Sequence, residues 1–345
     1  VIGPFATSNP EKYLENGGIV IKGEPEMYFH KFNKNLNDLK NLPQIIENFP
    51  IYNLDELAFP GWEVIFKNYT PKMKFLGPGS AININASRGC PYSCFYYCVY
   101  PLQQGRKLRL KSPDRLIEEM LYFYNKLKVK NFLFRDPVFS IDRKHTVEIC
   151  EAIIGSGIKF NICIEAHLKN IDNELAKILK KAGIKLIYVG IESAVEEVRK
   201  DAKRTSDTNE NQIEKVKYLE KNGIRVKSMY IIGMPTDTEN TFKKTVDYAK
   251  KINSSYAQFS VFTPYPGTPV FDEYKDKITK NKYEDFTQWQ LVFRHQNLTE
   301  KDVLYLLNYS YKEYYLNPKW AIRFLFNKIK DFYENLHNRL FGFSR

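Results

Sequence analysis

The chain has 345 residues, 43% of them hydrophobic and 15% aromatic, which suffices for one large globular domain or two ordinary ones. Its 52 basic residues exceed the 40 acidic ones by 12, so the surface is either simply lysine-rich or suited to an anionic partner. The five cysteines, three of them close together, do not form the dispersed, even set of a secreted disulfide framework. With no apolar run long enough to span a membrane and no signal peptide at the first residue, we expect a cytoplasmic protein.

We expect the first 80 residues to form two short regions, the end of an α/β domain and a connecting segment. Residues 1–33 read as a strand at 1–5, a helix opened by Ser8 and Pro10, and a strand at 18–23, as at the end of a larger α/β domain. Residues 34–80 carry five prolines and little periodicity, which predicts a connecting segment lying over a neighbouring domain.

From residue 81 to 290, short apolar runs alternate with amphipathic stretches. The runs predict strands at 81–86, 131–136, 159–168, 185–193, 225–235 and 256–266, and the stretches predict helices at 113–128, 142–155, 173–183, 209–222 and 238–252. Six such units predict an α/β fold with a parallel sheet, as a partial (β/α)6 barrel rather than the closed eight-stranded one. Residues 291–345 predict a helical extension, with Thr299 capping its first helix.

Three cysteines follow the first predicted strand, at the end of the barrel where active sites form. They are Cys90, Cys94 and Cys98 in "SRGCPYSCFYYCVYP". Three thiolates are too few for a structural zinc site or a fully ligated cluster, but they would leave one iron of a four-iron cluster open. The spacing favours an iron–sulfur cluster and leaves a zinc site or a purely structural role open. Cys150 and Cys163 lie in apolar runs and are expected in the core.

Polar side chains end several other predicted strands, where they would surround the cysteines. These residues are Asp136, Glu165, His167, Glu192 and Ser193. Each has a structural alternative: Ser193 precedes a helical stretch and would cap it, and His167 is as readily a hydrogen-bonded structural histidine as a pocket donor or acid.

The stretch "SRGCPYSCFYYCVYPLQQGRKLRLKSP" resembles the cluster loop of radical S-adenosylmethionine (radical SAM) enzymes. Three further stretches within the predicted barrel resemble the family's motifs on the fourth, fifth and sixth strands. They are "GIES" (190–193), "IIGMP" (231–235) and "TPYPGTP" (263–269). "VIGPFATSNPEKYL" and "GEPE" (23–26) resemble the end of a Rossmann-like cobalamin-binding domain, here truncated. "YKEYYLNPKW" resembles the tail of the anaerobic magnesium-protoporphyrin ester cyclase and hopanoid-modifying relatives.

The resemblance implies a set of cofactors and contacts. Cys90, Cys94 and Cys98 would hold a four-iron four-sulfur cluster whose open iron binds S-adenosylmethionine, and cobalamin would add methylation to the possible outcomes. The residues implied to contact S-adenosylmethionine are Tyr96 or Tyr97, Asp136, Glu165, Glu192, Ser193 and Gly233. No catalytic residue is assigned beyond the cluster. One feature departs from the family: "FYY" places three residues, instead of two, before Cys98.

The partners implied are a small-molecule or lipid substrate and an electron donor such as a flavodoxin or ferredoxin. The C-terminal helix is aromatic and basic, so it either packs on the barrel or lies on the anionic inner face of a membrane. Nucleic acid is not expected: a tRNA-modifying methylthiotransferase remains an alternative, but its additional N-terminal cysteines and RNA-binding barrel are not seen. A non-catalytic homologue with a cluster site impaired by the extra residue is the other alternative.

Overall fold

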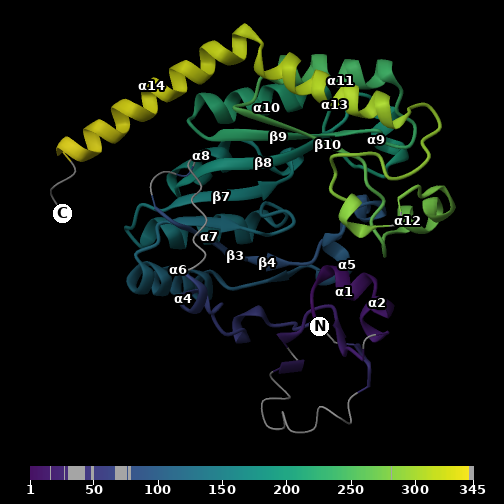
Figure 1. Cartoon of the computed structure of the whole chain (residues 1–345). Coiled ribbons are helices and arrows are strands. Elements are labelled where there is room, and N and C mark those ends of the chain that lie inside the picture. Colours follow the sequence, from purple (N-terminus) through teal and green to yellow (C-terminus); the bar gives the residue numbers. More distant parts are fainter. Residues whose placement is uncertain are drawn as a thin grey trace.

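A parallel six-stranded sheet forms the centre of the computed structural model, which describes residues 1–15, 17–26, 28–29, 43–47, 50–66, 76, 79–280 and 282–341 (Figure 1). Its strands lie in the order β10-β9-β8-β7-β6-β3. Their bounds are β3 Ala81–Ile84, β6 Asn131–Phe134, β7 Asn161–Ala166, β8 Ile184–Glu192, β9 Arg225–Ile232 and β10 Tyr256–Val261. All six strands fall where the apolar runs predicted them, and the order of successive neighbours confirms the partial barrel.

Helices cover one face of this sheet and leave the other partly open. The helices between the strands are α6 Pro113–Leu127, α7 Arg143–Gly155, α8 Asn173–Lys181, α9 Glu196–Asp201, α10 Asn209–Lys221 and α11 Glu239–Ile252. Alternate residues of β9 and β10 are fully buried, while the residues between them are partly exposed. The buried ones join the apolar core with α11, and the others line the inner face of the barrel. Cys150 and Cys163 are buried, as predicted.

Side chains satisfy the backbone at the free edge of β10. The Tyr315 hydroxyl accepts from the Ala257 N–H (3.0 Å) and donates to its C=O (2.7 Å). The Tyr311 hydroxyl contacts both backbone groups of Phe259 in the same way, at 3.2 and 3.1 Å. Tyrosines four residues apart on a helix are spaced about 6 Å along its axis, close to the repeat of alternate strand residues. Helix α13 (Glu300–Tyr315) thereby closes the edge of the partial barrel.

This edge contact predicts a stability effect. Replacing both Tyr311 and Tyr315 by phenylalanine removes four hydrogen bonds and is expected to lower the free energy of unfolding by about 2–4 kcal/mol. Urea unfolding of the purified variant measures it. The matched control is Tyr305→Phe on the same helix, whose side chain is 56% exposed and whose loss should cost under about 0.5 kcal/mol. An equal loss of unfolding free energy in the double variant and in the control would contradict the stabilising role of Tyr311 and Tyr315 at the β10 edge.

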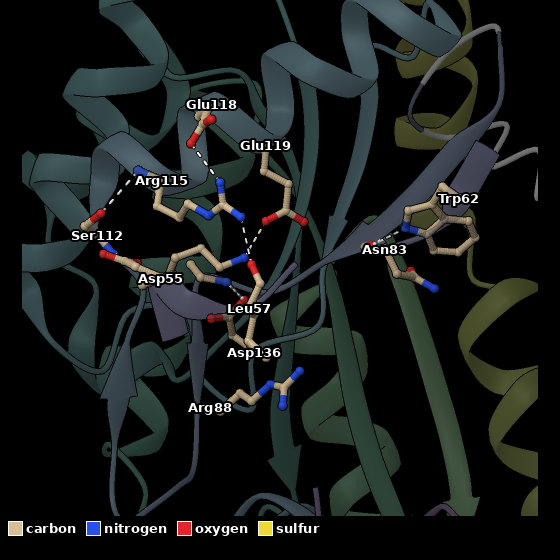
Figure 2. A network of polar contacts seen from close by, with 12 residues as sticks. Asp55, Leu57, Trp62, Asn83, Arg88, Ser112, Arg115, Glu118, Glu119 and Asp136 are labelled. Carbon is tan, nitrogen blue, oxygen red and sulfur yellow. Dashed lines mark hydrogen bonds and ion pairs between the residues drawn. The ribbon is translucent and has the colours of Figure 1, made fainter. Parts of the chain in front are cut away.

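At the opposite edge, the predicted connecting segment lies against β3 and α6. The Trp62 indole, in α4 (Trp62–Ile65), donates to the Asn83 carbonyl at 3.1 Å. The backbone N–H of Ser112 donates to Asp55 at 2.8 Å, and Arg115 donates to the Leu57 carbonyl at 2.7 Å (Figure 2). The part of this segment around residues 55–62 is therefore held against the barrel, whereas β2 (Ile45–Glu47) pairs with β1 (Val20–Lys22) in a separate two-stranded sheet. The rest of 34–80 falls mostly outside the described residues.

The N-terminal prediction was partly wrong. Residues 1–5 were expected to form a strand, but Pro4–Ser8 form helix α1, because a proline in the first turn of a helix loses no intrahelical bond there. Ser8 is accordingly the last residue of α1 and does not cap the next helix, α2 (Glu11–Leu14). The strand expected at 18–23 is present as β1 (Val20–Lys22), which pairs in parallel with β2. The domain boundaries and the assignment of 1–33 to a cobalamin-binding domain stay predictions.

The C-terminal extension is helical, as predicted. Thr299 caps α13 and exchanges hydrogen bonds with Asp302 at its third position. Helix α14 (Pro318–Phe341) follows, and in Figure 1 its far end stands clear of the other elements. Among the described residues, none of the helices combines the length and the apolar character needed to cross a membrane.

Candidate active site

The cysteine loop leaves the carboxyl end of β3 and is closed at its base. Strand β4 (Ser87–Arg88) pairs with β5 (Arg109–Leu110), and the Cys90 N–H donates to Gly105 at 3.2 Å. Gly89, with φ of 87°, lies so near the opposite strand that a Cβ would sit 2.1 Å from the Lys107 carbonyl. The loop therefore forms one closed unit that carries all three cysteines.

A buried ion pair ties this unit to the first segment of the chain. Arg109 donates to both carboxylate oxygens of Glu24, at 2.8 and 2.5 Å, and both side chains are under 5% exposed. Arg88 pairs with the same carboxylate at 3.4 Å and with Glu26 at 2.7 Å. The two glutamates of "GEPE" thus hold the base of the cysteine loop.

Asp136, the residue expected to contact S-adenosylmethionine, lies beneath the loop. Its carboxylate accepts from the Ala86 N–H (3.2 Å) and the Ser87 hydroxyl (2.6 Å), and it is fully buried. Burial raises its pKa to about 6, and the Ser87 hydrogen bond opposes that rise. In this position Asp136 supports the turn that leads into the cysteine loop.

The extra residue before Cys98 is accommodated by a helical turn. Helix η3 (Ser93–Tyr96) starts the turn, and the Cys98 N–H donates to the Cys94 carbonyl at 2.9 Å. Side chains four residues apart on a helical turn lie on the same face. The thiols of Cys94 and Cys98 accordingly lie close enough for each to shift the pKa of the other. A spacing of four thus keeps these two sulfurs adjacent.

Arg204 was not predicted from the sequence, yet it faces the cysteines. Its guanidinium donates to the Cys94 sulfur at 3.8 Å and to the Gly190 carbonyl at 2.9 Å, and it pairs with Glu192 at 3.5 Å. The neighbouring Cys98 thiol, with help from the Arg204 charge, lowers the pKa of the Cys94 thiol to about 6. The only signal in the sequence was a basic residue in the loop twelve positions after Glu192.

Glu192 is held in an uncommon backbone conformation at the end of β8. Its φ is 65°, and the register of β8 with β9 shifts between Gly190 and Glu192. A Cβ at Gly190 would lie 2.3 Å from the Glu192 carboxylate and 2.9 Å from Arg204, so a larger residue there would displace these two side chains. Burial raises the pKa of Glu192, and the Arg204 charge opposes that rise. The "GIES" motif thus turns a carboxylate toward the cysteine loop.

The two tyrosines of "FYY" point in different directions. The Tyr97 hydroxyl lies beside the Glu192 carboxylate and opposes the rise in its pKa, and the Tyr97 ring packs 5.9 Å from that of Phe262. Tyr96 instead donates to Glu273 at the surface, at 2.7 Å. Of the two, Tyr97 occupies the position suited to a cofactor contact.

Glu165 belongs to a second carboxylate cluster on the inner face. It pairs with Arg135 at 2.8 Å and accepts from the Tyr100 hydroxyl at 3.3 Å. Burial raises its pKa, while Arg135 opposes that rise. Tyr100 begins α5 (Tyr100–Gln104), two residues after Cys98, so this cluster joins the cysteine loop to β7.

Three other predicted residues fill structural positions. Ser193 is buried, bonds to the Thr245 hydroxyl at 3.2 Å and accepts from the Val195 N–H, although it does not cap α9. Gly233 has φ of 69°, which glycine adopts without strain. His167 contacts the Thr205 carbonyl through Nε2 at 2.8 Å and the Lys169 N–H through Nδ1 at 3.2 Å.

His167 predicts a pH dependence of stability. Burial lowers its pKa from 6.5 to about 4, so the folded state resists protonation that the unfolded state accepts. The stability that this histidine contributes is complete above pH 6.5 and is lost as the pH falls toward 4, by at most about 3 kcal/mol. Urea unfolding from pH 7 to 4 measures the loss. The variant His167→Gln should show a shallower slope over this window; an unchanged slope would contradict the assignment.

The cysteine set fits a cluster with an open iron. All five cysteines are free, and three thiols lie on one closed loop beside a guanidinium donor. Among the described side chains, no three His, Cys, Asp or Glu converge so as to hold a single metal ion. A cubane does not need that convergence, because each thiolate binds a different iron.

These features define the class of protein: an open six-stranded βα barrel whose candidate site lies at the carboxyl ends of the strands. A family model described as the radical SAM superfamily matches residues 84–249. The chain therefore carries a radical SAM domain, and the resemblance noted in the sequence is confirmed, as is its assignment as an enzyme.

Relatives extend the match beyond this domain. An uncharacterized methyltransferase of Pyrococcus horikoshii is 28% identical over 94% of this chain and 73% of its own length. The anaerobic magnesium-protoporphyrin IX monomethyl ester cyclase of Cereibacter sphaeroides is 28% identical over 74% of this chain, which spans only 42% of that protein.

Solved structures share the fold. The cobalamin-dependent S-adenosylmethionine radical enzyme OxsB aligns with a TM-score of 0.57 at 17% identity, over 79% of this chain and 42% of that one. The radical S-adenosylmethionine methyltransferase TsrM of Kitasatospora setae aligns with a TM-score of 0.53 at 21% identity, over 57% and 37%. At these identities the likeness concerns the fold.

Proposed function

We propose that this chain holds a four-iron four-sulfur cluster on Cys90, Cys94 and Cys98 and uses it to functionalise an unactivated C–H bond. The observation that carries the proposal is the closed loop that brings three free cysteines and Arg204 to the carboxyl end of the barrel. When bound, such a cluster supplies the electron that cleaves S-adenosylmethionine and so produces the radical that removes the hydrogen.

The chain's own residues bind and orient the cofactor. Arg204 stabilises the Cys94 thiolate and, with Glu192, presents one positive and one negative group at the strand end. Tyr97 faces the Glu192 carboxylate from the loop side and favours its charged form. In this proposal Glu192 accepts from donor groups of S-adenosylmethionine and Arg204 binds its carboxylate.

The outcome of the reaction and the remaining partners rest on the relatives. We propose a methylation that uses cobalamin, because the Pyrococcus relative is named a methyltransferase and both solved structures are described as binding cobalamin. A cyclisation is the second candidate, supported by the name of the Cereibacter relative. An external one-electron donor such as a flavodoxin or ferredoxin would reduce the cluster.

A cavity on the inner face of the barrel suits a small substrate. It measures about 350 Å³, and its floor carries Lys227, whose ammonium lies 4.9 Å from the centre of the Tyr188 ring. In the part of the chain that the structure describes, Lys227 forms no ion pair. Five aromatic side chains share the lining: Tyr188, Tyr256, Trp289, Tyr311 and Tyr315. We propose a flat apolar substrate whose anionic group meets Lys227.

The aromatic anion anilinonaphthalene sulfonate tests this cavity independently of the reaction. Lys227→Met should weaken its binding at least about fivefold, as expected for one lost charge-assisted contact. The matched control Lys177→Met lies on the exposed side of α8 and should leave binding unchanged. Equal binding by both variants would rule out this role of Lys227.

Anaerobic reconstitution with iron and sulfide tests the proposed function. The wild-type chain should bind four irons and four sulfides, and after reduction it should release 5′-deoxyadenosine from S-adenosylmethionine. A variant with alanine at Cys90, Cys94 and Cys98 should bind none, whereas Cys150→Ala, a change in the core, should bind the full amount. Equal iron content in the two variants, or no 5′-deoxyadenosine from the fully loaded wild type, would refute the proposal.

A further inference from the structure

Helix α14 carries an exposed apolar stripe. Ile322, Leu325, Phe326 and Ile329 repeat at the spacing of one helix face, and their side chains are 52–68% exposed. Four large apolar side chains in one exposed row are unusual for a soluble surface and mark an interaction site. Other residues of the same helix hold it to the barrel, so these four side chains are not needed for that packing.

The opposite side of α14 is anchored. Trp320 donates to the Ser255 carbonyl at 3.1 Å and meets the ring of Tyr315 edge-on at 4.7 Å. Arg323 donates to the Ser254 carbonyl, and Phe324 stacks on Trp320 at 5.0 Å. The start of α14 is thus fixed with its apolar stripe facing outward.

A basic hollow adjoins the anchored start of the helix. It measures about 930 Å³ and lies between α10, α11 and the first turns of α14. Among its lining residues are Lys217, Lys250, Lys251, Lys319 and Arg323, against the acids Glu220 and Asp247.

The charge of the hollow is only partly balanced. Lys250 is paired with Asp247 and Glu313, at 2.9 and 2.8 Å. Lys217, Lys251 and Lys319 are exposed and make no ion pair with any residue that the structure describes. The hollow therefore holds three ammonium groups that have no ion-pair partner among the described residues, and Lys319 lies one helical turn from Ile322 of the apolar stripe.

We infer that α14 and this hollow form one surface that docks on an anionic lipid bilayer. The stripe would insert at the boundary between headgroups and acyl chains, and the three lysines would meet lipid phosphates. The surface could be covered by an anionic bilayer or by a second copy of this chain. Charge complementarity favours the bilayer, because the chain carries a net charge of +12 and a second copy would bring like charges together. The inference is independent of the proposed function.

Co-sedimentation with vesicles tests it. The wild-type chain should pellet with vesicles of equal parts phosphatidylglycerol and phosphatidylcholine at 100 mM NaCl, bind pure phosphatidylcholine at least about tenfold more weakly, and be largely released at 500 mM NaCl. Equal binding to both vesicle types, or no binding to either, would overturn the inference.

Two variants separate the two parts of the surface. Leu325→Asp with Phe326→Asp places two charges in the middle of the stripe, and Lys217→Glu, Lys251→Glu and Lys319→Glu reverse the charge of the three lysines of the hollow. Each should lower the partition coefficient at least about a hundredfold, because three lysines near an anionic surface contribute about a factor of five each and two buried apolar side chains contribute as much. All five positions are exposed, so unchanged thermal unfolding should show that both variants are folded.

The matched control reverses three exposed lysines elsewhere: Lys275→Glu, Lys277→Glu and Lys301→Glu, with the same change in net charge. It should bind vesicles within about threefold of the wild type, because these lysines lie outside the proposed surface. A loss of vesicle binding equal to that of the hollow variant would mean that net charge alone explains the effect, and it would overturn the proposed site. Light scattering completes the test: a dimer that the stripe variant abolishes would assign the stripe to a second copy instead.

Discussion

Replacing Arg204 by glutamine is expected to destabilise the protein by about 3–5 kcal/mol, because it leaves a buried carboxylate without its counter-charge. Arg204 and Glu192 are each 10% exposed, and the guanidinium also bonds to the Gly190 carbonyl and the Cys94 sulfur. Urea unfolding of the protein before reconstitution measures the loss. In the reconstituted protein, release of 5′-deoxyadenosine should fall at least about tenfold.

The double variant Arg204→Gln with Glu192→Gln separates the two effects. Removing the orphaned carboxylate should recover most of the lost stability, but not the release of 5′-deoxyadenosine. The control Arg135→Gln breaks another arginine–glutamate pair at a strand end, where the arginine is 44% exposed, and should cost only about 1 kcal/mol. If Arg204→Gln lowers the free energy of unfolding no more than this control does, the buried pair of Arg204 and Glu192 does not stabilise the fold as proposed.

Deleting one tyrosine from "CFYYC" is expected to lower the iron content after reconstitution to less than about half that of the wild type. The loop is fixed at Cys90 by the hairpin and after Cys98 by Tyr100, which contacts Glu165. Removing a residue between these anchors turns the following side chains by about 100° relative to Cys94, so it displaces Cys98, Tyr100 or both.

Two point variants provide the controls for this deletion. Tyr96→Phe loses only a surface hydrogen bond and should keep its iron, whereas Tyr97→Phe loses the contact with Glu192. Iron and sulfide assays on all three variants measure the outcome. A rise in iron content on deletion would mean that the native loop is the impaired one.

Much of the barrel was predictable because its signals are local. Each strand is a run of apolar residues, and each of the five helices predicted between the strands carries an amphipathic period with a cap, such as Ser112 before α6. The failure at residues 1–5 has the same origin: a short apolar run does not distinguish strand from helix, and Pro4 decided in favour of α1.

The site was predictable only in part. The strand ends located Asp136, Glu165 and Glu192, but their different environments depend on contacts with remote residues. Asp136 lies under the loop because Ser87, 49 residues away in sequence, binds it. No local pattern relates Arg204 to Cys94, which are 110 residues apart.

The sequence by itself determined the order of strands and helices, the three-cysteine loop and the amphipathic period of the last helix, because hydrophobic spacing, caps and cysteine positions are properties of neighbouring residues. Only the tertiary structure decided that a spacing of four keeps Cys94 and Cys98 on one face, that Tyr97 rather than Tyr96 faces Glu192, and which face of α14 stays exposed. These facts depend on where distant segments pack, and packing is fixed by the whole chain.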